Sequence, residues 1–265
     1  VILSYEITAR HPHCQNKFTR RPLPRGKDDY PLHSRTFHPK IKTMSHPSPD
    51  ILTQGYRNCR RVTRHWAKSF YFASLFLPRQ RRDAAYAVYA VCRDCDNAVD
   101  HPDAAGPHAG LDRNRQRIAA VYQSASLTDP VWAAFQDTVR RYQIPRHYFD
   151  DLLAGMAMDL TPARYPDFPA LSVYCYRAAG VVGLIMLRIF GYQDPAAEQC
   201  AVDLGIAMQL TNILRDIQED YQRGRIYLPQ EDLRTFKVQE QTLAQASVDP
   251  PWQSLLTFER SEEHT

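Results

Sequence analysis

Residues Gln209–Pro229 read QLTNILRDIQEDYQRGRIYLP, and the rest of the chain is best interpreted from this stretch. At 3.6 residues per turn, Asp216 and Asp220 are neighbours on one face of a helix. Gln209 and Asn212 lie one to two turns upstream on roughly the same side, and arginines follow the aspartates. The stretch therefore predicts a helix with a polar stripe that ends beside a group of cations.

A second polar stripe lies upstream, in the segment YAVCRDCDNAVD. Its polar residues follow an i, i+4, i+7, i+11 course: Tyr89, Arg93, Asp96 and Asp100. Either aspartate pair alone is a weak signal, because such carboxylates are usually solvated or paired with nearby arginines. Both pairs are embedded among apolar residues, however, and a buried carboxylate needs a partner or a metal. Carboxylate oxygens suit Mg²⁺, which is often shared with substrate phosphates, so the two stripes favour a metal–diphosphate site.

The composition predicts a single helical domain. The chain has 265 residues, 44% of them hydrophobic, with only 10 glycines and no sustained alternation of apolar and polar residues. Such a chain can bury one substantial core. Helices are expected from residue 50, with Asp50 as the N-cap, then over 69–77, 81–100, 111–122, 130–142, 147–160, 171–190 and 196–221, with a last one over 239–259 interrupted by two prolines. Phe72 and Phe76 are expected in the core, and the glycine at 224 is expected to end the helix over 196–221. Gly180 and Gly183 are expected to leave room beside their helix for a long ligand.

The formal net charge of +4 comes from the beginning of the chain. Residues 1–43 hold nine Lys or Arg against three acids, together with five prolines. We interpret this segment as a disordered basic leader without the features of a secretory signal, and we hypothesise that it is not native. The remainder carries no basic stripe that would favour nucleic-acid binding. We expect a catalytic domain over residues 44–259, truncated at its C-terminal end, and a non-native tail over 260–265.

The cysteines and the apolar runs indicate in which cellular compartment the protein is expected. Six scattered cysteines do not form a disulfide framework, which favours a reducing cytoplasm. Cys92 and Cys95 form a lone CxxC without further ligands, so a zinc site is not expected. The longest apolar run, over residues 178–187, is shorter than the ~20 residues that span a bilayer. The sequence therefore predicts a cytoplasmic protein that is soluble or lies on a membrane surface.

Two segments carry a resemblance to a known family. CRDCDNAVD and NILRDIQEDYQRGRIYLP resemble the two aspartate-rich motifs of the squalene and phytoene synthases, and the match covers about residues 68–229. The stretches SFYFASLFLP, YAVYAVCR, YCYRAAGVVGLIM and AMQLTNILRD are most similar to phytoene synthases. One position departs from the pattern, since Asn97 stands where the family usually has a second adjacent aspartate. The resemblance implies an all-α isoprenoid synthase bundle around one central cavity.

The resemblance also implies roles for individual residues. It places Mg²⁺, or Mn²⁺, on Asp96, Asp100, Asp216 and Asp220, and makes Tyr89 a catalytic hydrogen-bonding or proton-relay group. A flap of Arg223, Arg225 and Tyr227 is expected over the diphosphates, and arginines would neutralise the leaving group. The substrate-binding residues that we expect are Ser69, Arg93, Gln209, Asn212, Arg215, Arg225 and Tyr227.

The reaction implied is the head-to-head condensation of two geranylgeranyl diphosphates, through a cyclopropyl diphosphate, to phytoene. The sequence leaves open a C30 enzyme that makes squalene or dehydrosqualene from farnesyl diphosphate, and NADPH would be needed only for a reduced C30 product. A non-catalytic assembly protein of the same fold is a third possibility, although it predicts lost aspartates. Prenyl diphosphates and a membrane surface for the apolar product are the expected partners. No nucleic acid is expected, and the oligomeric state is open.

Overall fold

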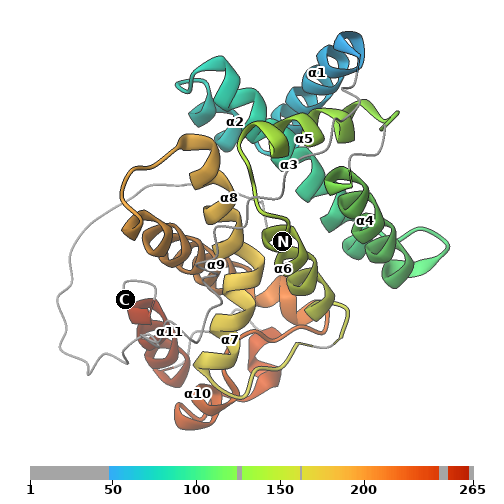
Figure 1. Ribbon diagram of the computed structural model, residues 1–265. Helices are drawn as coiled ribbons and strands as arrows, with labels where there is room; N and C mark the ends of the chain where they lie inside the picture. Colours follow the sequence, from blue (N-terminus) through green and yellow to red (C-terminus); the bar gives the residue numbers. More distant parts are fainter. Residues whose placement is uncertain (1–47, 124–126, 162, 245–249, 263–265) are drawn as a thin grey trace.

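A computed structural model describes residues 48–123, 127–161, 163–244 and 250–262. Within these ranges every regular element is a helix, and the β pairing is limited to a single bridge between Arg164 and Ile226 (Figure 1). The predicted all-α class is confirmed. The expected leader over residues 1–43 and the last three residues lie outside the described part of the chain.

The helices follow the order of the expected segments, with shifted ends. Their bounds are α1 Pro49–Trp66, α2 Lys68–Ser74, α3 Arg79–Asp100, α4 Gly106–Tyr122, α5 Pro130–Arg141, α6 Arg146–Met158, α7 Phe168–Cys175, the π-helical turn η1 Tyr176–Gly180, α8 Val181–Phe190, α9 Ala196–Gln222, α10 Gln230–Thr235, the 3₁₀ turn η2 Glu240–Ala244 and α11 Pro250–Glu262.

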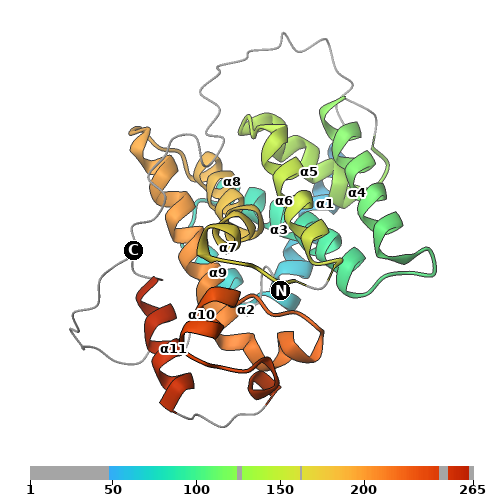
Figure 2. The same cartoon turned by 90° about the horizontal axis from the view of Figure 1, so that it is seen from below.

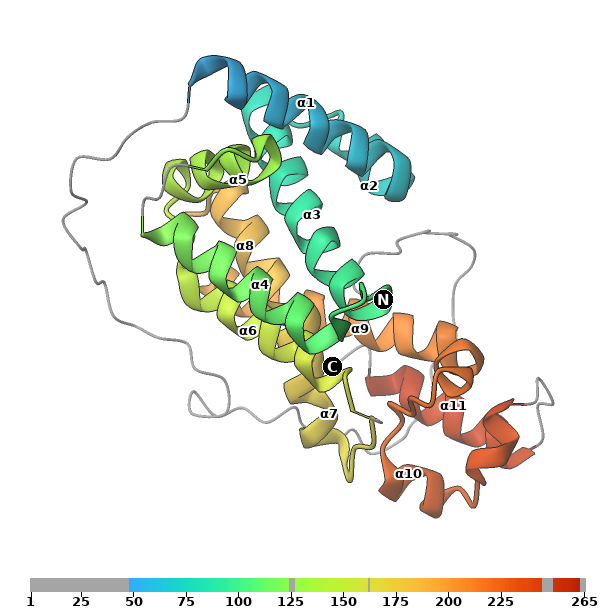
Figure 3. The ribbon, with the colours of Figure 1, turned by 90° about the vertical axis from the view of Figure 1, so that its right-hand side faces the viewer.

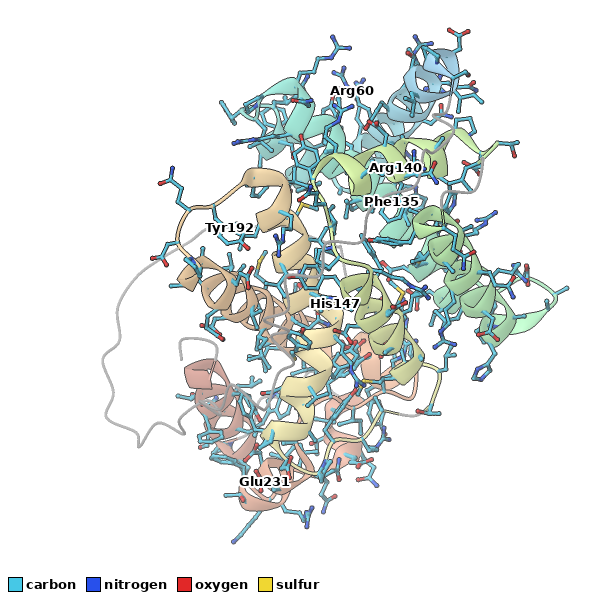
Figure 4. The ribbon with its side chains drawn as sticks, viewed as in Figure 1. Arg60, Phe135, Arg140, His147, Tyr192 and Glu231 are labelled. Atoms are coloured by element: carbon cyan, nitrogen blue, oxygen red, sulfur yellow. The ribbon has the colours of Figure 1, made fainter. Side chains whose placement is uncertain are left out.

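Helix α3 crosses the middle of the molecule. Figure 3 shows α1 and α2 packed across its first half, with α9 beyond its last turn. Helices α4, α5 and α6 flank one side of α3, and α8 backs α9 on the other side (Figures 1 and 3). One continuous core joins α3 to α9, and α1 and α2 pack against α3 and α5 through a separate buried cluster. In Figure 4 the labelled Phe135 lies in that core, where its ring packs edge-on against Phe149 at 4.9 Å between centroids.

Local signals explain most helix ends. Asp129 caps α5 through its side chain, and Pro130 occupies the first turn, as its fixed φ favours. Helix α9 stops before Gly224, whose φ of +77° suits only glycine at low cost, as predicted. The first helix is capped by Ser48, not by Asp50 as the sequence suggested. Residues 106–110, expected in a loop, begin α4 because a proline is tolerated in a first turn.

Helices α7, η1 and α8 form one continuous rod from Phe168 to Phe190. We expected its glycines to leave room for a long ligand, and this expectation is wrong for Gly183. A Cβ there would lie 2.2 Å from the carbonyl oxygen of Ala201 on α9. Gly205 of α9 is equally constrained, since its Cβ would lie 2.5 Å from the carbonyl oxygen of Ala179. These glycines let two helix backbones approach, which fixes α9 against the core.

This rod is long and apolar enough to cross a membrane by length and composition alone. The apolar run over residues 178–187, which is too short by itself, lies within this helix of 23 residues. The apolar window is 61% buried inside the protein, as is typical of a core helix. Its apolar character is therefore accounted for by packing among the other helices.

The segment after α9 forms a smaller unit on the same side as the end of α9 (Figure 2). Its own core consists of Ile226, Leu228, Leu233, Val238, Leu243 and Leu255, and Ile217 of α9 packs against it. The two prolines expected to interrupt a helix instead begin α11 at Pro250. Pro is compatible with this first turn because its missing N–H has no helical acceptor there.

Candidate active site

The first aspartate motif lies in the last turns of α3. Asp96 is only 5% exposed, and one of its carboxylate oxygens, Oδ2, is buried without a hydrogen-bond partner among the described residues. Asp100 is the final residue of the helix, and its side chain is 21% exposed. The motif thus pairs a deeply buried carboxylate with one that reaches the surface.

The second motif lies in the last turns of α9. Asp220 is 3% exposed, whereas the Asp216 side chain is 24% exposed. The Arg215 guanidinium donates two hydrogen bonds to Asp216, from Nε to Oδ1 at 2.7 Å and from Nη2 to Oδ2 at 2.6 Å. Gln209 and Asn212 on the same helix are also buried. The prediction that this polar stripe is largely buried is therefore confirmed.

Arg225 brings the two motifs together. Its Nη2 lies 3.6 Å from Oδ1 of Asp100 on α3, and its main-chain N–H donates to the carbonyl of Asp220 at 2.9 Å. The side chain is only 11% exposed. Arg225 therefore contacts the end of α3 through its guanidinium group and the end of α9 through its main chain.

The structure adds one carboxylate, Asp159, whose role the sequence left open. Asp159 is the C-cap of α6 and accepts hydrogen bonds from the hydroxyls of Tyr227, at 2.7 Å, and Tyr174, at 3.1 Å. Arg225 Nη2 also donates to the main-chain carbonyl of Asp159 at 3.4 Å. A single acidic residue between two apolar ones, Met158 and Leu160, was the available sequence signal.

Three helices therefore end with a carboxylate near Arg225, namely α3, α6 and α9. A helix C-terminus carries a partial negative charge, so acidic residues there are unfavourable unless a cation offsets them. Such an arrangement costs stability in the absence of a cation, and it is typical of a site that binds one.

Burial changes the protonation of two of these aspartates. It raises the pKa of Asp96 to about 7, and the nearby Asp100 charge adds to the shift. Burial likewise raises the pKa of Asp220 to about 7, with Asp216 contributing in the same direction. Burial raises the pKa of Tyr89 to about 12, so its hydroxyl stays protonated and can donate a hydrogen bond.

Several other polar atoms at the site are buried without a hydrogen-bond partner among the described residues. They are Nε2 and Oε1 of Gln209, Nδ2 of Asn212, Nε of Arg93 and Nη1 of Arg225. A buried polar group without a partner costs about 1–3 kcal/mol. A ligand rich in oxygen atoms, together with a cation, would satisfy these groups and Asp96.

Comparisons with known proteins agree with this geometry. The family model described as squalene/phytoene synthase matches residues 63–264. The chain belongs to the squalene/phytoene synthase family. It is 39% identical to the 15-cis-phytoene synthase of Synechococcus elongatus over 78% of this chain and 71% of that protein. It is also 39% identical to the 15-cis-phytoene synthase of Synechocystis sp. over 83% of this chain and 69% of that protein.

Solved structures show the same fold. A dehydrosqualene synthase crystallised with a ligand superposes with a TM-score of 0.75 at 32% identity, covering 81% of this chain and 75% of the other. The squalene synthase HpnC of Alicyclobacillus acidocaldarius also gives a TM-score of 0.75, at 28% identity and 82% coverage of each chain. Squalene/phytoene synthases use prenyl diphosphates and generally depend on divalent metals.

The remaining residues expected from the family pattern are spread along α2 and α3. Ser69 is half-buried on α2. The Arg93 guanidinium lies over the ring of Trp66 at 4.7 Å. Tyr89 is buried and stacks on Phe70 at 5.9 Å between ring centroids. Two aromatic residues that we expected in the core, Phe72 and Phe76, are instead 70% and 89% exposed.

The expected flap is only partly present. Arg225 faces the aspartates, but Arg223 pairs with Glu219 one turn back on α9 at 2.6 Å. Tyr227 is 2% exposed, and its ring stacks on Tyr174 at 4.9 Å between centroids. Next to these residues, a small pocket is lined by Ile213, Ile217, Asp220, Arg225, Ile226, Tyr227, Leu228 and Leu243. The segment after α9 is thus a packed wall of the site.

The donor set fits a metal shared with a substrate. Among the described residues, no three His, Cys, Asp or Glu side chains are grouped closely enough to hold a metal ion by themselves. Mg²⁺ typically takes one or two carboxylates and completes its shell with water and phosphate oxygens. The unpartnered oxygen of Asp96 is a suitable ligand of this kind. Cys92 and Cys95 are buried, free thiols on α3.

Proposed function

We propose that this protein is a phytoene synthase that condenses two geranylgeranyl diphosphates head to head, through a cyclopropyl diphosphate. The observation that carries the proposal is the pair of aspartate motifs at the ends of α3 and α9, joined by Arg225. The substrate class follows the relatives at 37–39% identity, which are named phytoene synthases. All four aspartates of the family pattern are in place, which argues against a non-catalytic assembly protein.

Mg²⁺ is the metal that we propose, held by Asp96 and Asp100 on one side and by Asp216 and Asp220 on the other. Mn²⁺ prefers the same oxygen ligands and could replace it. The metal supplies charge neutralisation for the departing diphosphate. Deprotonation of Asp96 and Asp220 must accompany binding, because both have a pKa of about 7.

The protein's own cations and polar groups then orient the diphosphates. Arg225 lies between the motifs, while Arg93 and Arg215 lie on the two motif helices, so all three can donate charge-assisted hydrogen bonds to phosphate oxygens. Gln209 and Asn212 offer buried amides beside them. Tyr89 can donate from a protonated hydroxyl, and its stacking on Phe70 presents aromatic surface suited to a carbocation.

Product analysis tests the proposal. The full chain is incubated with Mg²⁺ and either geranylgeranyl or farnesyl diphosphate, and extracted hydrocarbons are identified by mass. We expect a C40 product from geranylgeranyl diphosphate that is abolished in Asp216→Ala. If only farnesyl diphosphate gives a product, and that product is a C30 hydrocarbon, the protein is a dehydrosqualene synthase and not a phytoene synthase. If formation of the C30 product requires NADPH, the protein is a squalene synthase. No turnover with either substrate would contradict the enzyme function of this chain.

We also propose that the protein works in the cytoplasm at a membrane surface, through α2 and its neighbours. Phe72 and Phe76 expose their rings there, next to Trp66, which is 55% exposed. Between residues 51 and 82 the chain has no acidic residue and eight basic ones, Arg57, Arg60, Arg61, Arg64, Lys68, Arg79, Arg81 and Arg82. Apolar rings with a basic rim suit an anionic bilayer. The free cysteines of the described part support a reducing compartment.

Vesicle co-sedimentation tests this surface. The full chain should sediment with vesicles that contain anionic phospholipid and much less with neutral ones. The double variant Phe72→Ser/Phe76→Ser should remain in the supernatant, whereas Phe190→Ser, at an exposed ring at the end of α8, should behave as the wild type. Equal sedimentation of the α2 variant and the wild type would rule out this docking surface.

A further inference from the structure

We propose that Asp159 is a positioning residue, which holds Arg225 and Tyr227 against the two aspartate motifs so that Arg225 can receive a diphosphate. The inference rests on the proposed function, because it assigns a task within the same site. Asp159 belongs to neither aspartate motif. Its position at the end of α6 makes it the third acidic helix terminus beside Arg225.

The contacts of Asp159 reach two residues of the segment after α9, Arg225 and Tyr227. Its carboxylate Oδ1 accepts from the Tyr227 hydroxyl at 2.7 Å, and its carbonyl accepts from Arg225 Nη2 at 3.4 Å. The second carboxylate oxygen accepts from the Tyr174 hydroxyl at 3.1 Å. One residue on α6 therefore tethers two alternate residues of the segment after α9.

The main chains on either side reinforce this tether. The N–H of Ile226 donates to the carbonyl of Ala163 at 3.1 Å, and the N–H of Gln230 donates to that of Tyr165 at 2.8 Å. Arg164 adds a hydrogen bond from Nη1 to the Gly224 carbonyl at 3.1 Å. The stretch after α6 and the stretch after α9 thus run side by side, and Asp159 lies at the end of this pairing nearest the aspartate motifs.

Asp159 is buried, so its charged form needs the positive charge of Arg225 nearby. Arg225 in turn is attracted by the charge of Asp159. Burial raises the pKa of Asp159, while the Tyr227 hydrogen bond and the Arg225 charge act in the opposite direction. Arg225 is attracted by Asp159 and Asp100 at once. In a variant without the Asp159 carboxylate, Arg225 would keep the main-chain carbonyl of residue 159 and its ion pair with Asp100. It would lose the attraction of the Asp159 charge, and it would collapse onto Asp100 or turn outward. Asp159 therefore keeps the guanidinium group between α3 and α9.

The direct test measures diphosphate binding without turnover. Inorganic diphosphate is titrated in the presence of Mg²⁺ into the full chain, and the dissociation constant is obtained by calorimetry. Asp159→Asn keeps the shape and the main-chain carbonyl but loses the charge, so the hydroxyls of Tyr227 and Tyr174 no longer bond a charged acceptor. We expect about tenfold to a hundredfold weaker binding, the size of a hydrogen bond to a charged group. Asp150→Asn is the matched control, because Asp150 is on the same helix and pairs with Arg146 at the surface.

A double-mutant cycle separates positioning from general stability. Tyr227→Phe removes the hydroxyl that donates to Asp159 but retains the stacked ring. If both residues act through one tether, Asp159→Asn/Tyr227→Phe should bind diphosphate only slightly more weakly than the poorer single variant. Fold-changes that multiply would overturn the proposal, as would an Asp159→Asn variant with a lower Tm and unchanged binding. Should Asp159→Asn fail to fold, Tyr227→Phe with wild-type binding would overturn it.

The outcomes distinguish this inference from the proposed function. One outcome is that the wild-type chain forms no C40 product while Asp159→Asn still binds diphosphate more weakly than the wild type. This outcome supports the tether and contradicts phytoene synthesis. Phytoene formation with unchanged kcat and KM in Asp159→Asn supports the function and contradicts the tether. A wild-type chain that binds no diphosphate in the presence of Mg²⁺ contradicts both.

Discussion

The aspartate motif of α3 and that of α9 have the same spacing but opposite burial. On α3 the first aspartate, Asp96, is buried and the second, Asp100, is partly exposed. On α9 the first, Asp216, is partly exposed and the second, Asp220, is buried. Each motif thus combines a carboxylate whose pKa is raised to about 7 with one that has a cationic partner.

The partners of the exposed aspartates also differ. Asp216 is paired with Arg215, its neighbour in sequence, whereas Asp100 is paired with Arg225, which follows the other motif. The α9 motif therefore has a local counter-charge of its own. The ion pair of Asp100 on α3 instead spans 125 positions of the chain, from Asp100 to Arg225. We infer that the α3 side is the more sensitive to the arrangement of the segment after α9.

The largest effects should come from the two buried aspartates. We expect Asp96→Asn and Asp220→Asn each to lower kcat by about 10²–10³, as for loss of one preorganised electrostatic group. Both changes remove a charge that burial disfavours, so the metal-free variants should melt at a higher temperature than the wild type.

Matched controls exist on both helices. Asp94→Asn on α3 and Glu219→Gln on α9 each alter an exposed carboxylate that pairs with a surface arginine. Both should retain wild-type turnover. Steady-state kinetics and thermal melting in EDTA check the set, and a melting temperature that falls in Asp96→Asn would contradict the interpretation of its burial.

The pH dependence of stability should follow the same two residues. In the folded protein Asp96 and Asp220 have a pKa of about 7, against an ordinary value of 3.8. Between these values the folded state holds protons that the unfolded chain has released, so the free energy of unfolding falls as pH rises and levels off above about pH 7. Each aspartate should contribute about 4 kcal/mol to this fall.

Urea unfolding in EDTA across this pH range measures the effect. Mg²⁺ should reduce the fall, because it binds the deprotonated carboxylates. The Asp96→Asn and Asp220→Asn variants should each have a flatter profile than the wild type. A profile unchanged by either substitution would show that other groups are responsible.

A change at the contact between α8 and α9 should have a smaller effect on stability and on the site, and it should affect mainly one of the two motifs. Gly183→Ala places a Cβ against the Ala201 carbonyl and should destabilise the fold by about 1–3 kcal/mol, as overpacking does. The displacement should affect the α9 motif more than the α3 motif. Gly106→Ala is the control for a glycine without close neighbours, although its positive φ adds strain of its own.

The readout is urea unfolding together with calorimetric Mg²⁺ binding. We expect the Gly183→Ala variant to bind Mg²⁺–diphosphate more weakly in proportion to its loss of stability. A Gly183→Ala protein of wild-type stability would contradict the close approach of these two helices.

The smallest effect should come from Asn97→Asp, which restores the adjacent pair usual in the family. Asn97 is only half-buried, next to Asp96. An added charge at such a position changes stability by about 0.5 kcal/mol or less. We expect kcat to change less than threefold, as measured by steady-state kinetics. A loss of activity of tenfold or more would show that the asparagine is required at this position.

The sequence was sufficient for the family, the all-helical class and the two motif helices, because these depend on local spacing. It also located Gly224 after α9 from its position beyond the last periodic residue. Burial of the stripes followed from the apolar residues around Asp96 and Asp220. The phytoene function expected from the motifs agrees with the names of the relatives.

The sequence did not reveal contacts between distant segments. Asp159 meets Tyr227 across 68 residues, and neither residue has a local pattern that predicts the pairing. The exposure of Phe72 and Phe76 was missed because aromatic residues at helical spacing usually pack inside a core. The role of Gly183 was misjudged because its neighbour is distant in sequence, and only the structure shows that α9 lies against it.

The π-helical turn at residues 176–180 divides the rod Phe168–Phe190 into two parts. The side chains of the second part are rotated about the helix axis relative to those of the first part. Such a turn accommodates one extra residue, and one residue corresponds to about 100° of rotation in an α-helix. Tyr174, before the turn, faces Asp159, while Gly183, after it, faces α9. Deleting one residue here would rotate one of these faces away from its neighbour. The turn therefore allows the part of the rod that contacts Asp159 and the part that packs against α9 to change in evolution separately from each other.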